Sequence, residues 1–137
     1  METRIHPTRL NPGQDLKRAI QSLVEDNNIR AGWVATCVGS LTQLNLRFAN
    51  KEKGVREAGF FEIISLSGTV SKNGCHLHLS VGREDGTIIG GHLLDGCIVY
   101  TTAEIVIEET AEFIFHREHD GKTGWKELRI EKAAQTP

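Results

Sequence analysis

Three histidines in the segment 75–92, CHLHLSVGREDGTIIGGH, have a type and spacing that suit metal chemistry. His76 and His78 are two residues apart, so on a β-strand both side chains point to one face of the sheet. His92 follows on a second predicted strand, after a tight turn. Three imidazoles that converge would leave a fourth position open. That is the ligand set of a catalytic rather than a purely structural metal site.

The turn between the two predicted strands decides whether His92 joins the other two histidines. A three-residue loop that ends at Gly86, in the left-handed conformation, places His78 opposite His92. A two-residue loop places Leu77 opposite His92 instead and sends that histidine to the other face. Gly86 is the last residue before the second strand, and this favours the first register.

The same spacing also has a purely structural interpretation. His76 and His78 would then face solvent, while Leu77 and Leu79 face a core. A histidine pair at this spacing often arises by chance, and the chain has six histidines. Cys75 lies on the face of Leu77 and adds no ligand. The residues alone therefore leave both a metal site and a solvent-exposed pair open.

Two carboxylates and one arginine could complete an active site. Glu104 lies in the apolar run 98–107, where a carboxylate is costly to bury unless it is paired or has a function. Glu62, between two apolar residues, raises the same question. Arg47 could bind an anion through two hydrogen bonds if it lies in a cleft. The alternative is that these charges are exposed, to solvent or at a subunit contact.

The composition is that of an ordinary globular domain, with 39% hydrophobic and 25% charged residues in 137. We therefore expect a single domain over residues 1–137. The net charge of −2 argues against a stand-alone nucleic-acid binder, because phosphate contacts need a basic surface. Three cysteines without a C-x-x-C motif indicate buried free thiols in a reducing compartment. No secretory signal or membrane-spanning run is predicted, so we expect a cytoplasmic protein without membrane contact.

The elements that must position these residues are mostly strands. Alternating patterns predict strands at 3–10, 31–38, 41–50, 60–70, both arms of the histidine hairpin, 93–109, 111–118 and 125–132. Gly39-Ser40 is expected to interrupt a strand, and 51–59 to form a loop. Helical spacing predicts one helix at about 13–27, with Asp15 in its first turn. The predicted fold class is α+β: a mostly antiparallel sheet, partly closed toward a barrel, with one or two packed helices.

Three longer runs resemble the PPC (plants and prokaryotes conserved) domain: GSLTQLNLRFAN, GFFEIISLSGTVS and HLHLSVGREDGTIIGGHLLDGCIVYTTAEIVI. The resemblance extends from RLNPGQDL at 9–16 to the strand at 111–117. It is specific in the Ser67-Gly68 pair and the Gly90-Gly91 doublet. One position departs from the family pattern. Phe60 stands where the family often has an arginine, so no role of that arginine is transferred to this chain.

The resemblance implies an α/β sandwich-like domain that assembles as a homotrimer. The apolar run 97–107 adds support, because it exceeds what a small monomer needs at its surface. The prokaryotic pattern HLH…GGH is present here as His76, His78 and His92. The fold is also similar to that of acetolactate decarboxylase, whose zinc is held by three histidines, two of them in an H-x-H. We therefore expect zinc or another divalent metal at these histidines.

Three hypotheses for the function follow. The first is a metal-dependent enzyme on a small anionic substrate, in which Glu104 or Glu62 transfers protons and Arg47 binds a carboxylate. The second is a DNA-binding regulatory protein without catalysis, which requires the basic segments 51–56 and 117–126 to cluster. The third is a non-catalytic trimeric scaffold. Plant members bind DNA through an Arg-Gly-Arg-Pro AT-hook that this sequence lacks, so we expect DNA binding to be weak or absent.

Overall fold

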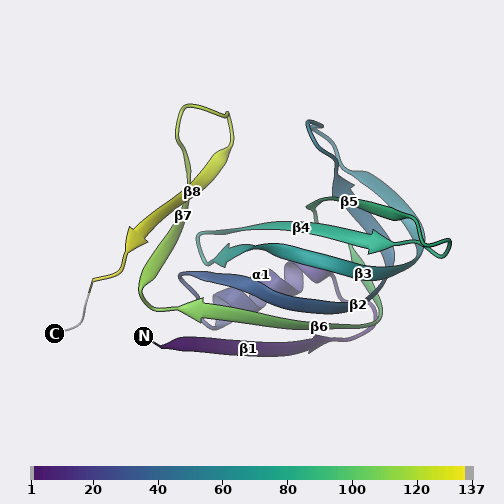
Figure 1. The fold of residues 1–137 in the computed structure, drawn as a ribbon, viewed down its shortest axis with the longest axis horizontal. Coiled ribbons are helices and arrows are strands. Elements are labelled where there is room, and N and C mark those ends of the chain that lie inside the picture. Colours follow the sequence, from purple (N-terminus) through teal and green to yellow (C-terminus); the bar gives the residue numbers. More distant parts are fainter. Residues whose placement is uncertain (1, 135–137) are drawn as a thin grey trace.

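Residues 2–134, which the computed structural model describes, fold into eight strands and one helix (Figure 1). The elements in chain order are β1 (Thr3–Leu10), α1 (Leu16–Asp26), β2 (Gly32–Arg47), β3 (Val55–Ser71), β4 (Gly74–Gly82), β5 (Ile88–Leu93), β6 (Ile98–Thr110), β7 (Phe113–His119) and β8 (Lys126–Lys132). No helix among the described residues has the length and apolar character needed to span a membrane.

Six of the strands form one antiparallel sheet in the order β1-β6-β2-β3-β4-β5. The last residues of β2 also pair with β5, through Leu46 opposite Leu93 and Arg47 opposite His92. Strands β2 to β5 therefore close on themselves at one end, which confirms the predicted α+β fold with a partly closed sheet. Strand β1 pairs with β6 alone, and Pro7 is accommodated because its missing N–H is tolerated on an edge strand.

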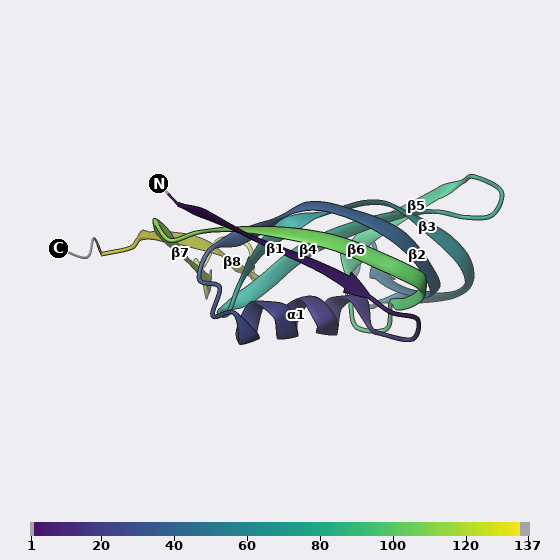
Figure 2. The ribbon, with the colours of Figure 1, turned by 90° about the horizontal axis from the view of Figure 1, so that it is seen from below.

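Helix α1 covers one face of the sheet, as Figure 2 shows. Its inward residues pack with apolar residues from the strands into a single core. Leu77 and Leu79 of β4 belong to this core and are almost completely buried. Because side chains alternate along a strand, His76 and His78 must point to the opposite face, away from the helix. The burial of Leu77 and Leu79 in the core thus fixes the orientation of His76 and His78 on the opposite face of β4.

The start of α1 lies later in the chain than the sequence predicts. Asp15 is the N-cap rather than a first-turn residue, and its Oδ1 accepts the backbone N–H of Arg18 at 3.1 Å. The predicted start at Gly13 is wrong by about one turn. The backbone N–H of Gly13 donates to the carbonyl of Val99 in β6, and that of Leu16 donates to the carbonyl of Cys97 just before β6, each at 2.9 Å. The segment before Asp15 is therefore held against the sheet and cannot join the helix.

The predicted interruption at Gly39-Ser40 is also wrong, because β2 continues through it to Arg47. The chain bends there without breaking: the pairing of β2 with β6 shifts register between Gly39 and Leu41. Gly39 has a φ of +156° and packs directly on the backbone of β6. Similarly, the predicted loop 51–59 is shorter, since β3 already begins at Val55. Long bent strands are what allow this sheet to close.

Strands β7 and β8 form a separate two-stranded sheet that projects from one end of the molecule (Figure 1). Both strands and the turn between them were predicted from the sequence. The hairpin is tied to the main sheet through Phe115. Its N–H donates to the carbonyl of Arg30 at 2.9 Å, and its carbonyl accepts the hydroxyl of Ser71 at 2.9 Å.

Candidate metal centre

The β4–β5 turn has the register that brings the histidines together. Gly86 has a φ of +84°, and its N–H donates to the carbonyl of Arg83 at 2.8 Å. The N–H of Arg83 in turn donates to the carbonyl of Thr87 at 2.8 Å, which closes a three-residue loop. His78 lies directly opposite His92 in the ladder. The predicted register is confirmed, and the alternative with Leu77 opposite His92 is excluded.

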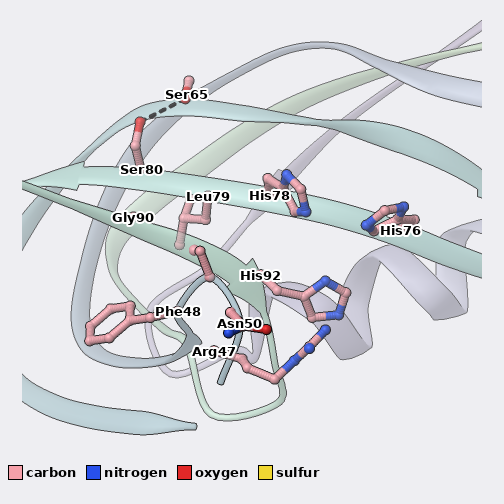
Figure 3. Close-up of a pocket in the computed structure, with 12 residues that line it drawn as sticks. Arg47, Phe48, Asn50, Ser65, His76, His78, Leu79, Ser80, Gly90 and His92 are labelled. Carbon is pink, nitrogen blue, oxygen red and sulfur yellow. Dashed lines mark hydrogen bonds between the residues drawn. The ribbon is translucent and has the colours of Figure 1, made fainter. Parts of the chain in front are cut away.

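The three histidines converge from two strands onto one side of the sheet (Figure 3). One ring nitrogen from each of His76, His78 and His92 lies within 4.8 Å of the other two. The ring centroids are 4.8, 5.4 and 5.8 Å apart. A tetrahedral ion with bonds of about 2.0–2.1 Å needs nitrogen separations of about 3.3 Å. The rings must therefore turn toward one another to hold such an ion.

The surroundings of His76 and His92 favour the neutral form of these two rings. Burial lowers the pKa of His92 to about 4, and the Arg47 guanidinium acts in the same direction. Partial burial, followed by the charge of Arg117, lowers the pKa of His76. A metal ligand must be a neutral imidazole, so both shifts favour ligation over protonation. Among the described residues, no group hydrogen-bonds to these ring nitrogens, which leaves them available as donors to an ion.

The donor set therefore fits a divalent metal. Three neutral imidazoles suit zinc, copper, iron or nickel, and zinc accepts three protein ligands plus one open position. The histidines line a cavity of about 440 Å³ that opens to solvent, with Arg47, Asn50 and Ser80 also in its wall. A ligand therefore has room at the open position, which a closed structural zinc site does not offer.

Arg47 reaches this cavity because β2 ends against β5. It is the register partner of His92, and the approach depends on Gly91. A Cβ atom on Gly91 would lie 2.7 Å from the carbonyl oxygen of Arg47, closer than real side chains come. The second glycine of the Gly90-Gly91 doublet is therefore needed for two backbones to approach. Arg47 is the member of the predicted charged trio that the structure brings to the histidines.

Glu62 and Glu104 lie elsewhere on the same outward face of the sheet. Both are exposed, so neither is a buried carboxylate that needs a partner. Glu62 lies on β3 opposite Ser40 and Gly82, at the other end of the β3–β4 pairing from His76. Glu104 lies on β6 opposite Val38, and β2 and β3 separate it from the histidine hairpin. Neither glutamate is among the residues that line the cavities holding the histidines.

The sequence reasoning missed residues that the β7–β8 hairpin contributes. Arg117, Trp125 and Glu127 line a second cavity that shares His76 and His92 with the first. The Arg47 guanidinium carbon lies 4.6 Å from the centre of the Trp125 ring. No local pattern marks these residues, because a hairpin tens of residues away in sequence is brought to the site by the fold alone. A tryptophan in a polar turn was the available signal.

Comparisons with known proteins agree with this architecture. The bifunctional protein GlmU from a Synechococcus strain is 44% identical over 132 residues, which is 96% of this chain and 21% of that protein. The chain thus spans about a fifth of the length of the curated relative it matches. A solved structure of a hypothetical protein from Salmonella is 41% identical, with a TM-score of 0.93, and covers 96% of this chain and 95% of its own.

Two further solved structures have the same fold and informative descriptions. A protein from Archaeoglobus fulgidus described as metal-containing is 27% identical, with a TM-score of 0.77 and 92% and 93% of the two chains covered. A candidate DNA-binding protein from Bacteroides thetaiotaomicron is 25% identical, with a TM-score of 0.81 and 91% of each chain covered.

The family assignment rests on most of the chain. The model of the Plants and Prokaryotes Conserved (PCC) domain, the family abbreviated PPC above, matches residues 1–111. That range contains the closed sheet, helix α1 and the three histidines, and it ends before β7. This chain belongs to the Plants and Prokaryotes Conserved domain family.

Proposed function

We propose that this chain is a metal-dependent enzyme domain in which His76, His78 and His92 hold one divalent cation. Zinc is the ion that suits three imidazoles and an open position best. The observation that carries the proposal is the convergence of three ring nitrogens within 4.8 Å at the wall of an open cavity. The solved Archaeoglobus relative described as metal-containing supports it.

The roles of the residues follow from their positions. A bound ion would supply Lewis acidity at its open position. Arg47, beside His92, is placed to bind an anionic group of the substrate and to hold it next to that position. The low pKa of His92 keeps its imidazole a ligand instead of a proton donor. The proposed substrate is therefore a small anion that fits a cavity of about 440 Å³.

We propose a homotrimer as the working assembly, in line with the family resemblance. The outward face of the sheet exposes apolar side chains where strands β2, β3 and β6 lie together. Ile64 is 57% exposed and Tyr100 46% exposed, while the Tyr100 and Phe60 rings stack edge to face at 4.9 Å. Apolar surface of this kind is typical of a protein–protein contact.

The same face carries Glu62 and Glu104. Because neither lines a cavity with the histidines in its own subunit, we propose that a glutamate transfers protons only across a subunit contact. The position of Glu62 beside exposed Phe60 and Tyr100, around a small cavity, supports this arrangement.

Elemental analysis of the purified protein, followed by zinc titration of the metal-free form, tests the metal proposal. We expect one divalent ion per chain, lost in His78→Ala. His116→Asn is the matched control, because His116 hydrogen-bonds to Glu131 on the separate hairpin, at 2.7 Å. Wild-type protein that takes up no divalent metal would overturn the proposal.

A second candidate is a DNA-binding protein, in line with the description of the Bacteroides relative. The contact of Arg47 with Trp125 brings the basic segments 51–56 and 117–126 toward one side of the molecule, and both turns project the same way in Figure 1. The net charge of −2 limits how many phosphates such a surface can neutralise. We therefore rank it second.

A further inference from the structure

A second cavity, of about 620 Å³, adjoins the three histidines on the side of the β7–β8 hairpin. Its wall combines the ends of β2, β4 and β5 with residues of the hairpin. Its charged, imidazole and aromatic lining residues include Arg47, His76, His92, Arg117, Trp125 and Glu127. The cavity thus places two guanidinium groups and an aromatic ring beside the proposed metal ligands.

Arg47 is held in place by the hairpin. Its guanidinium rests on the ring of Trp125, with 4.6 Å between the guanidinium carbon and the ring centre. Its Nη1 also donates to the carbonyl of Lys51 at 3.5 Å. Within residues 2–134, Arg47 has no carboxylate partner. A cation that stacks on an aromatic ring keeps its N–H edge free for an anion.

Arg117 is fixed from the opposite side of the cavity. Its Nη2 donates to the hydroxyl of Thr69 at 2.7 Å, and Thr69 lies directly across the ladder from His76. Its aliphatic stem passes over Gly74, where an added Cβ would lie 2.9 Å from the Arg117 Cγ. Partial burial lowers the pKa of Arg117, and the charge of Glu127 acts in the opposite sense. In the described part of the chain Arg117 also lacks an ion pair.

Arg47 and Arg117 place two positive charges beside a cluster suited to a dication, and Glu127 in the same wall offsets one of them. The positive charge that remains repels a bound metal unless an anion lies between them. An oxyanion relieves this repulsion and offers each guanidinium the paired hydrogen bonds it favours. The arrangement is therefore that of a site for metal and anion together. The hairpin that supplies Arg117 and Trp125 follows the segment 1–111 that matches the family model.

We propose that Arg47 and Arg117, with Trp125 as a wall, form an anion subsite for the carboxylate or phosphate of a small acid. A second oxygen of the same acid faces the three histidines. The β7–β8 hairpin thereby selects the substrate class. The role of the second oxygen rests on the proposed function, whereas binding of the oxyanion to the two arginines does not.

The first experiment uses the metal-free chain 1–137 with Trp33→Phe, so that Trp125 is its single tryptophan. We expect glycolate to change its fluorescence in a saturable way, and ethylene glycol, the neutral analogue, to have no effect. Inorganic phosphate is titrated in parallel. Tighter binding of glycolate identifies a carboxylic acid, and tighter binding of phosphate a phosphate ester. If neither anion binds by fluorescence or calorimetry, the subsite is overturned.

Variants then locate the binding. By calorimetry, Arg117→Met and Arg47→Met should each weaken anion binding about tenfold or more, because a charge-assisted hydrogen-bond pair is lost. Arg129→Met is the matched control: it removes the same charge from the same hairpin, but Arg129 pairs with Glu118 at 2.8 Å, outside the cavity. Equal effects of Arg117→Met and Arg129→Met would show only long-range electrostatics and would contradict the proposal.

A last measurement separates the two proposals. Bound zinc must raise the affinity for the anion by the same factor by which the bound anion raises the affinity for zinc, since coupling between two sites is reciprocal. Glycolate affinity is therefore compared with and without one equivalent of zinc. Anion binding without zinc uptake would overturn the metal proposal and leave the subsite intact. Zinc uptake with unchanged affinity for glycolate would overturn the shared site.

Discussion

Arg47 and His92 are register partners at the point where β2 meets β5, and this pair joins the closed end of the sheet to the histidine cluster. The guanidinium of Arg47 lowers the pKa of His92, with burial as the larger cause. This backbone pairing thus fixes the position of a proposed metal ligand, and the charge of Arg47 adds to the burial that favours its neutral form.

Zinc binding should persist to lower pH than three ordinary imidazoles would allow. From unperturbed histidines we expect binding to weaken below about pH 6.5. The pKa of His92 is lowered to about 4 and that of His76 is also lowered, so protons compete for these two rings only in more acidic solution. Zinc titrations between pH 5 and 7.5 (about the range in which histidine titrates) measure this. If zinc affinity already falls between pH 7 and 6 as steeply as competition by three protons predicts, the prediction is wrong.

Gly91→Ala should disturb the site without touching a ligand. The added Cβ would meet the carbonyl oxygen of Arg47 at 2.7 Å, so β2 and β5 must separate. We expect a loss of about 1–3 kcal/mol in the free energy of unfolding and weaker zinc binding. Gly82→Ala, in the same hairpin, is the control, since its nearest neighbour would lie at an ordinary 3.5 Å. Urea unfolding measures the stability of both variants, and zinc titration measures their affinity for the metal. Equal values for the two variants would contradict the prediction.

Ile64→Glu should dissociate the proposed trimer, because it places a charge in the exposed apolar face. Ile130→Glu is the control: Ile130 is 59% exposed on the separate hairpin. Light scattering coupled to size exclusion should give a trimer mass for wild type and Ile130→Glu, and a monomer mass for Ile64→Glu. A monomer mass for the wild type at every concentration would contradict the proposed trimer.

Asp15→Ala should destabilise the fold through two lost hydrogen bonds. Its Oδ1 caps α1, and its Oδ2 accepts the N–H of Gly96 at 2.7 Å, just before β6. We expect the free energy of unfolding to fall by about 1–2 kcal/mol. Asp15→Asn keeps one acceptor and should lose less. If the two variants lose equal stability, capping is not the cause.

Duplex DNA should bind weakly and without sequence preference. The net charge is −2, and helix α1 carries only Lys17 and Arg18 as cations, so it presents no row of basic residues. Few phosphates can be neutralised, so affinity should fall only gradually as salt rises. A fluorescence anisotropy titration at physiological salt checks this. Nanomolar, sequence-selective binding would favour the DNA-binding candidate instead.

Local patterns determined most of the secondary structure and part of the site. Alternation placed Leu77 and Leu79 inward and the histidines outward, and Gly86 set the turn register that brings His92 opposite His78. These features depend on neighbours a few residues away, so the order of side chains is sufficient to predict them. The edge position of β1 followed in the same way from Pro7.

Only the tertiary structure decided what surrounds the histidines. The pairing of β2 with β5 brings Arg47 to His92, and the β7–β8 hairpin brings Arg117 and Trp125. These contacts join segments far apart in sequence, and they depend on how bent strands close and where a hairpin docks. Bulges absorb that bending at Gly39, where the sequence alone predicted a break. Long-range closure has no local signature, because it results from packing of the whole sheet on its core.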